Sequence, residues 1–254
     1  MLSIINTDST DLPLRSGIAT LVYVDPPRSN SINIHGGIIH DFEKFTHLWF
    51  FHATRIMAPD SYLLITTNHL TRYMIEKEIH YSLPEGIKYV QELIWWYSFG
   101  LYSTRHFVNT HETILVLKKG NPKYNWTSIA IRSARQDAGD PRADQRGRNP
   151  DGFLIPTTVC KINRRPGNSL DRYFMESELT GKRSCQPIDL VEVFIKAYTT
   201  NSTDLIVDMF GGSGSMIKAA QKLGRSCISI DKCYQYCKEE YERLFNNWKR
   251  IQGV

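Results

Sequence analysis

Three apolar runs in this chain each end in an aspartate that is followed directly by a turn. They are residues 19–24 before Asp25, 205–207 before Asp208, and 227–230 before Asp231. Continuous runs of β-branched and aliphatic residues are typical of strands that are buried on both faces. Helical patterns alternate with these runs, so we predict an α/β fold with a mostly parallel sheet. The three carboxylates would then line one rim of that sheet, where ligands bind in such folds.

The other elements follow from the same apolar periodicities. Further strands are expected at residues 2–5, 62–67, 92–98 and 112–117, the last two as a hairpin. Helices are expected at residues 42–57, 70–80, 188–198, 216–223 and 234–248. Residues 120–183 have weak periodicity and many Gly, Pro, Arg and Asp, which indicates a loop-rich insert. We therefore divide the chain into residues 1–119, the insert 120–183, and residues 184–254.

The composition narrows the class of protein. A chain of 254 residues with 41% hydrophobic residues can build one large domain and is too apolar to be disordered. No apolar run is long enough to span a membrane, and the N-terminus lacks a signal-peptide pattern, so we expect a cytoplasmic protein. The cysteines are loosely spaced, which favours reduced thiols and no metal site: Cys160, Cys185, Cys227, Cys233 and Cys237.

Positive charge is concentrated in the predicted insert. Residues 119–183 hold 13 Lys and Arg against 7 Asp and Glu, whereas the whole chain has a net charge of +5. A basic segment on a near-neutral body is expected of a protein that binds a polyanion such as DNA. A solvated basic loop is the alternative. The arginines that we expect to contact DNA are Arg135, Arg142, Arg146, Arg148, Arg164 and Arg165.

A glycine-rich turn follows the strand at 205–207. It has the sequence Asp208-Met209-Phe210-Gly211-Gly212-Ser213-Gly214. Glycines let the backbone approach a ligand closely, and Asp231, 23 positions after Asp208 (231 − 208), could accept from both hydroxyls of a ribose. Neither the dinucleotide fingerprint nor the phosphate-binding loop matches, so we expect a nucleoside ligand without a pyrophosphate. A tight turn without a ligand is the alternative.

The strand at 19–24 runs into Asp25-Pro26-Pro27-Arg28. Two prolines stiffen the loop, so that the Asp25 carboxylate and the Pro26 carbonyl become fixed hydrogen-bond acceptors. Two acceptors match the two protons of an amino group. An ordinary turn at the end of a strand is the alternative.

Together these motifs resemble the β class of DNA adenine-N6 and cytosine-N4 amino methyltransferases. Asp25-Pro26-Pro27 is similar to that family's catalytic Asp-Pro-Pro-aromatic motif, and Phe210-x-Gly212-x-Gly214 to its cofactor motif. Supporting likenesses occur in the family's order at residues 6–8, 111–119, 133–151 and 186–187. The resemblance implies a Rossmann-like fold with a seven-stranded sheet, in a circularly permuted order in which the catalytic half comes first.

The resemblance also implies a cofactor, a substrate and roles for residues. The cofactor would be S-adenosylmethionine and the substrate double-stranded DNA, with the target base flipped out of the helix. Asp25, Pro26, Pro27 and Arg28 would form the catalytic loop. The cofactor would be held by Asp8, Asp25, Gln186, Pro187, Asp208, Phe210, Gly211, Gly212, Ser213, Gly214 and Asp231. Family members are often dimers, so a homodimer is expected as well.

One departure from the family pattern keeps alternatives open. Arg28 stands where the family has an aromatic residue that stacks on the flipped base. A guanidinium can also stack on a base, but the change equally fits a DNA-binding subunit that has lost catalysis. Asp25 favours adenine over cytosine, because cytosine-N4 enzymes more often have serine there. A methyltransferase for RNA or protein glutamine is a third hypothesis, which the motif order and the insert disfavour.

Overall fold

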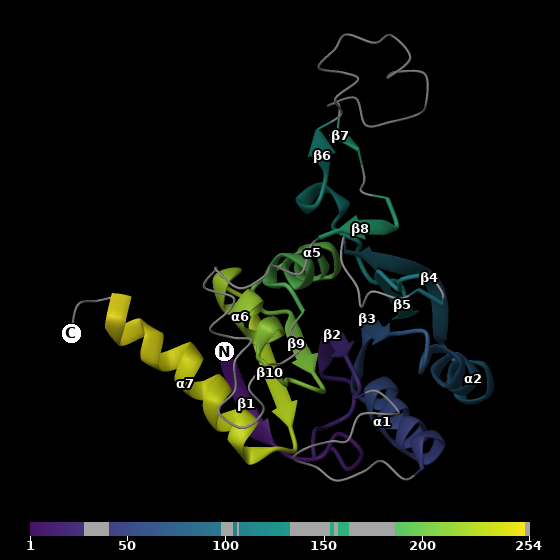
Figure 1. Cartoon of the computed structure of the whole chain (residues 1–254). Helices are drawn as coiled ribbons and strands as arrows, with labels where there is room; N and C mark the ends of the chain where they lie inside the picture. The colour runs from purple at the N-terminus through teal and green to yellow at the C-terminus, as the bar shows by residue number, and fades with distance from the viewer. Residues whose placement is uncertain are drawn as a thin grey trace, which may run out of the picture.

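The computed structural model describes residues 1–27, 41–97, 104–105, 107–132, 153–154, 157–162 and 186–251. These residues form three layers, in which a central sheet lies between two groups of helices (Figure 1). The alternation of strands and helices along the chain thus produces the predicted α/β architecture.

Within the described residues, the central sheet has eight strands in the order β1-β10-β9-β2-β3-β5-β4-β8. Their bounds are β1 Leu2–Asn6, β2 Ala19–Val24, β3 Met57–Thr67, β4 Ile87–Trp96, β5 His111–Lys119, β8 Val159–Lys161, β9 Leu205–Asp208 and β10 Ser226–Asp231. All neighbours are parallel except β3–β5 and β5–β4, which are antiparallel. The mostly parallel sheet is therefore confirmed, as is the hairpin of β4 and β5.

The predicted count of seven strands is wrong. The additional strand is β8, three residues long, which comes from the predicted loop-rich insert. It pairs in parallel with the outer edge of β4, where Ile94 is opposite Val159 and Trp96 is opposite Lys161. The edge of a sheet offers unpaired backbone groups, so even a short segment with weak periodicity can join it.

Two hydrophobic cores cover the two faces of the sheet. Alternate residues of a strand point to opposite faces, so Leu21 and Tyr23 belong to one core and Val22 and Val24 to the other. Helices α5 (Ile188–Tyr198), α6 (Ser215–Lys222) and α7 (Tyr234–Ile251) lie on the first face. Helices α1 (Phe42–Ile56) and α2 (Arg72–Ser82) lie on the second (Figure 1).

The observed elements agree with the predicted ones to within a few residues, except that two strands begin five residues earlier than expected: β4, expected from residue 92, begins at Ile87. The strand expected at 62–67 begins at Met57 instead, directly after α1. Ala19 of β2 pairs with Met57, and the register then shifts before Leu21 pairs with Tyr62. The segment containing Pro59 lies in that irregularity, which explains why a proline and an aspartate there do not end the strand.

Short elements of the insert extend away from the central sheet. They are a 3₁₀ turn, η1 (Trp126–Ser128), and the antiparallel pair β6 (Ile131–Arg132) and β7 (Phe153–Leu154). Figure 1 shows β6 and β7 beyond β8, on the far side from α1. The division of the chain into residues 1–119, 120–183 and 184–254 stays a prediction.

The connections diverge between β2 and β9, which are neighbours in the sheet. Strand β2 leads through α1 to β3 on one side, and β9 leads through α6 to β10 on the other. Because α1 and α6 cover opposite faces, the chain leaves these two strands in opposite directions. This is the topological switch point of an open α/β sheet, where ligands bind beyond the carboxyl ends of the strands.

The glycine-rich turn between β9 and α6 is packed tightly against β10 and α7. Gly211 donates its N–H to the Ile230 carbonyl at 2.7 Å. A Cβ on Gly211 would lie 2.1 Å from Oγ of Ser229. Gly214 begins α6 with φ +79°, and a Cβ there would lie 2.8 Å from Cγ of Glu240. Packing therefore requires glycine at both positions, and the positive φ of Gly214 requires it by conformation as well.

No helix among the described residues is both long enough and apolar enough to cross a membrane.

The packing of Gly211 leads to a stability prediction. Gly211→Ala should lower the free energy of unfolding by about 1–3 kcal/mol, because the new methyl group overlaps Oγ of Ser229. In a Ser229→Ala background the overlap is relieved, since the next nearest atoms lie at 3.4 Å. Urea denaturation of the four proteins of this cycle measures the difference. The prediction would be contradicted if Gly211→Ala lowered the free energy of unfolding by the same amount in both backgrounds.

Candidate active site

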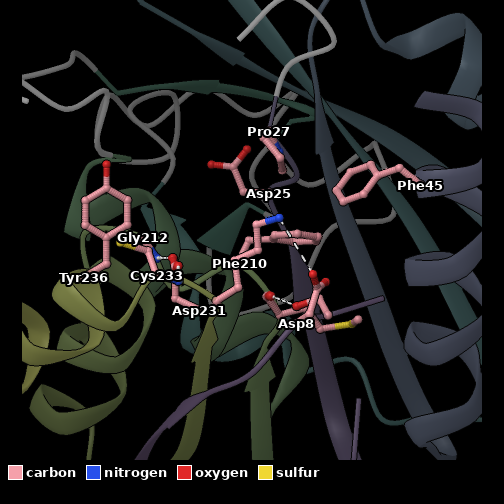
Figure 2. Close-up of a pocket in the computed structure, with 12 residues that line it drawn as sticks. Asp8, Asp25, Pro27, Phe45, Phe210, Gly212, Asp231, Cys233 and Tyr236 are labelled. Carbon is pink, nitrogen blue, oxygen red and sulfur yellow. Dashed lines mark hydrogen bonds and ion pairs between the residues drawn. The ribbon is translucent and has the colours of Figure 1, made fainter. Parts of the chain in front are cut away.

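Two cavities open at the switch point and share Asp25, Phe210 and Gly212. The rim cavity extends towards β10 and α1, and the inner cavity extends towards α5 and α6. The rim cavity is lined by Asp8, Ser9, Asp25, Pro27, Phe45, Met209, Phe210, Gly212, Asp231, Lys232, Cys233 and Tyr236 (Figure 2). The inner cavity is lined by Tyr23, Asp25, Gln186, Val191, Asp208, Phe210, Gly211, Gly212, Ser213, Ser215 and Met216.

Asp231 ends β10 and connects the glycine turn to the start of α7. Its Oδ2 accepts from the backbone N–H of Gly212 at 3.0 Å, and its Oδ1 accepts from the N–H of Cys233 at 2.8 Å. The side chain faces the rim cavity (Figure 2). A fixed carboxylate of this kind can accept hydrogen bonds from two neighbouring hydroxyl groups of a ligand.

Asp8 lies across the rim cavity, just beyond the end of β1. Its Oδ1 accepts from the N–H and the hydroxyl of Thr10, at 2.9 and 2.7 Å. Its Oδ2 faces the ammonium of Lys232 at 3.7 Å. Both side chains are partly exposed, so this ion pair contributes little to stability. The turn at Thr10 fixes one oxygen of Asp8 and leaves the other directed at the cavity.

Aromatic rings form one wall of the rim cavity. Phe45 from α1 and Phe210 from the glycine turn have ring centroids 6.0 Å apart, and Trp49 packs edge-on against Phe210 at 6.4 Å. Such pairs are stabilising beyond the area they bury. The wall can stack against a flat apolar ligand, such as a purine, beside the carboxylates of Asp8 and Asp231 (Figure 2).

Asp25 lies where the two cavities meet. The carboxylate is half-buried, Pro26 is buried beneath it, and Pro27 lines the rim cavity. Gln186, which directly precedes α5, donates from Nε2 to Oδ2 of Asp25 at 3.1 Å. Asp25 can therefore face ligands in both cavities at once.

Asp208 lies below Asp25 at the end of β9 and is 2% exposed. Burial is the main cause that raises its pKa well above the ordinary value, and the nearby Glu240 adds to the shift. The N–H of Phe210 donates to Asp208 Oδ1 at 3.2 Å. The backbone N–H of Met209 donates to the Tyr23 carbonyl at 3.0 Å, so the glycine turn is tied to β2 directly.

The fold thus brings together most of the site residues that the sequence singled out. Asp8, Asp25, Pro27, Gln186, Asp208, Phe210, Gly211, Gly212, Ser213 and Asp231 line one cavity or the other. Pro187 and Gly214 do not line them; they are the N-cap residues of α5 and α6. Arg28, Arg135, Arg142, Arg146, Arg148, Arg164 and Arg165 lie outside the described residues.

The sequence reasoning missed several lining residues. Phe45 falls within the helix predicted at 42–57, and no sequence signal separates it from Phe42 or Trp49. Thr66, near the end of β3, is not among the lining residues but contacts Gln186 behind them, and a hydroxyl residue at the carboxyl end of a strand at this rim was a usable signal. Tyr23, which the sequence placed in the strand at 19–24, lines the inner cavity although its ring is buried.

Metal ligands do not gather among the described residues: no group of three or more His, Cys, Asp or Glu side chains could hold an ion. The described cysteines, Cys160, Cys227, Cys233 and Cys237, are free thiols.

Known proteins are similar to this chain in sequence, and solved structures are similar to it in fold. Type II methyltransferase M.HpaI of Haemophilus parainfluenzae is 26% identical over 213 residues, which are 83% of this chain and 62% of that protein. The chain thus spans less than two thirds of that relative. DNA adenine methyltransferase YhdJ of Escherichia coli strain K12 is 26% identical over 237 residues, or 88% of this chain and 75% of that protein.

A solved structure and a family profile complete the comparison. The crystal structure of the M1.HpyAVI–SAM complex superimposes with a TM-score of 0.66 at 16% identity, covering 96% of this chain and all of that one. The fold is therefore that of the S-adenosylmethionine-dependent methyltransferases, with the Asp-Pro-Pro half first. The profile of the DNA methylase family, N6_N4_Mtase, matches residues 19–242. This chain belongs to the DNA methylase family of N6 and N4 amino methyltransferases.

Proposed function

We propose that this protein transfers a methyl group from S-adenosylmethionine to the exocyclic amino group of a flipped base in DNA, and that the base is adenine. Proteins of this family use S-adenosylmethionine. The observation that supports the proposal most directly is the position of Asp25, which lines both the rim cavity and the inner cavity. A group at that junction can contact a methyl donor and a methyl acceptor together.

The residues of the two cavities suit the parts of the donor. Asp231 would accept from the ribose hydroxyls, and the ring of Phe210 would stack on the adenine with Asp8 close to its edge. Gly212, with φ +50°, leaves room for the nucleoside beside the turn. The methionine portion would lie in the inner cavity near Gln186 and Ser213. Bound there, S-adenosylmethionine supplies an electrophilic sulfonium methyl group.

Asp25 and the carbonyl of Pro26 would prepare the amino group for attack. The lone pair of an exocyclic amine is delocalised into the base, so the nitrogen is a poor nucleophile. Two fixed acceptors that receive hydrogen bonds from both N–H groups favour a tetrahedral nitrogen, whose lone pair then becomes available. Positioning and charge stabilisation would provide most of the rate. The six arginines of the insert would bind the DNA backbone, and a homodimer stays part of the proposal.

Adenine is preferred because Asp25 begins the catalytic motif and because YhdJ is named a DNA adenine methyltransferase. Cytosine N4 is the second candidate, since the family includes N4 enzymes. Arg28, in place of the family's aromatic residue, motivates a catalytically inactive DNA-binding subunit as the remaining alternative.

The base and the activity are tested together by incubating the protein with S-adenosylmethionine and unmethylated duplex DNA. Mass spectrometry of the digested nucleosides should show N6-methyladenine. N4-methylcytosine would replace the adenine assignment with the second candidate. DNA binding without any methylated nucleoside would support the inactive subunit.

Asp25→Ala should lower kcat for DNA methylation by at least about 100-fold, because the transition state loses a fixed acceptor for the amino group. The affinity for S-adenosylmethionine, measured by isothermal titration calorimetry, should change far less. The matched control is Asp60→Ala: Asp60 also accepts a backbone N–H, from Asn121 at 2.7 Å, but it precedes the part of β3 that reaches the site. An Asp25→Ala protein with normal kcat would exclude the assigned role.

Asp231→Ala should weaken the binding of S-adenosylmethionine by roughly 10- to 100-fold. Hydrogen bonds to a charged group contribute about 1.5–3 kcal/mol, and the variant also releases the N–H of Gly212. Calorimetry on the DNA-free protein measures the loss, again with Asp60→Ala as the control. Unchanged affinity would show that the ribose is bound elsewhere.

A further inference from the structure

A closed ring of hydrogen bonds lies directly behind Asp25. Its members are the phenol of Tyr23 on β2, the hydroxyl of Thr66 on β3 and the side-chain amide of Gln186 before α5. Tyr23 donates to Oε1 of Gln186, Nε2 of Gln186 donates to Thr66 Oγ1 at 3.2 Å, and the two hydroxyl oxygens are 2.9 Å apart. All three side chains are buried, with exposures of 3%, 2% and 9%.

The carboxylate of Asp25, which can only accept, determines which way the amide of Gln186 points, and the hydroxyl groups of the ring adapt to that orientation. Because the Tyr23 proton is used on Oε1, the Thr66 hydroxyl donates to Tyr23, and its own oxygen accepts one proton of Nε2. Every hydrogen bond of the ring then has one donor and one acceptor. The second proton of Nε2 remains and is directed at Oδ2 of Asp25, 3.1 Å away. A flipped amide would instead bring its carbonyl oxygen against the carboxylate.

Two further features of the structure hold this arrangement in place. Burial raises the pKa of Tyr23 well above its ordinary value, and the charge of Asp25 adds to the shift, so the phenol keeps its proton. The backbone carbonyl of Gln186 accepts from the hydroxyl of Ser215 at 2.8 Å. Gln186 is thus fixed by α6 on its main chain and by β2 and β3 on its side chain.

We propose that Gln186 is a positioning residue for Asp25: the ring with Tyr23 and Thr66 presents an N–H to Oδ2, which holds the carboxylate so that Oδ1 faces the methyl acceptor. This inference rests on the proposed function only where it concerns the rate of methyl transfer. The orientation and charge of Asp25 can be measured without any methyl transfer. This role differs from contact with the cofactor, because the amide of Gln186 orients Asp25, the carboxylate that accepts a hydrogen bond from the target amino group.

The first measurement is the titration of the Asp25 carboxyl by carbon NMR in the ligand-free protein, with its signal assigned by its loss in Asp25→Asn. Gln186→Glu replaces the donor with a second acid of the same shape, and like charges oppose each other's ionisation. The midpoint of Asp25 should move to higher pH in Gln186→Glu and, by a smaller amount, in Gln186→Leu. The other charged groups around the site stay the same: Asp8, Asp208, Glu112, Asp231 and Lys232.

The second measurement is steady-state kinetics on DNA. Gln186→Glu should lower kcat by roughly tenfold or more, the loss expected for one charge-assisted hydrogen bond. The acidic limb of its profile of kcat against pH should move to higher pH, as the NMR midpoint of Asp25 does. Tyr23→Phe and Thr66→Val each remove one hydrogen-bond partner that holds the amide in place. Both should lower kcat with little change in the KM for S-adenosylmethionine.

Matched controls remove comparable groups elsewhere. Tyr62→Phe deletes a buried phenol that donates to the Pro122 carbonyl, and Thr54→Val deletes a buried hydroxyl that bonds within α1. Both should leave kcat and the Asp25 midpoint unchanged.

The outcomes separate the two proposals. An unchanged Asp25 midpoint in both Gln186 variants would overturn the positioning role, even in an active enzyme. A moved midpoint in a protein that methylates no DNA would support the positioning role and reject the proposed function. A raised KM for S-adenosylmethionine at constant kcat would assign Gln186 to cofactor binding alone.

Discussion

The parallel pairing of β2 with β9 is the interaction on which the rest of the site depends. Leu21 lies opposite Ile206 and Tyr23 opposite Asp208, although more than 180 positions separate them in the chain. Because consecutive parallel strands end at the same rim, this register places Asp25 directly beside the glycine turn. The N–H of Met209, which donates to Tyr23, extends the pairing by one residue into the turn itself. A shift of register here would separate the two motifs.

The site is built mainly from groups that are fixed before any ligand arrives. Both oxygens of Asp231 are held by backbone N–H groups, one oxygen of Asp8 is held by Thr10, and Asp25 receives the amide of Gln186. Preorganised polar groups lose little freedom on binding and need little rearrangement during reaction. Burial is the main cause that raises the pKa of Asp208, and the neighbouring carboxylate of Glu240 adds to the shift.

The sequence predicted the parts of the fold that local patterns control. The helix at 188–198 and the strand at 19–24 have the predicted bounds, because a helical apolar period continues through the first and an unbroken apolar run through the second. It did not predict β8, because a three-residue segment has no period of its own and becomes a strand only by pairing with β4. For the same reason the sequence could not distinguish Phe45 from the other aromatic residues of its helix, since Phe45 lines the rim cavity only through its contact with Phe210.

The amino-acid sequence by itself determined the two motifs, the order in which they occur and the acids at the strand ends, since these are properties of short continuous segments. Only the tertiary structure decided that they share one pair of cavities, that Asp8 and Asp231 face each other across the rim, and that Gln186 joins Tyr23 and Thr66 behind Asp25. These contacts join residues that are distant in the chain, and their geometry depends on strand register and helix packing, which no local pattern encodes.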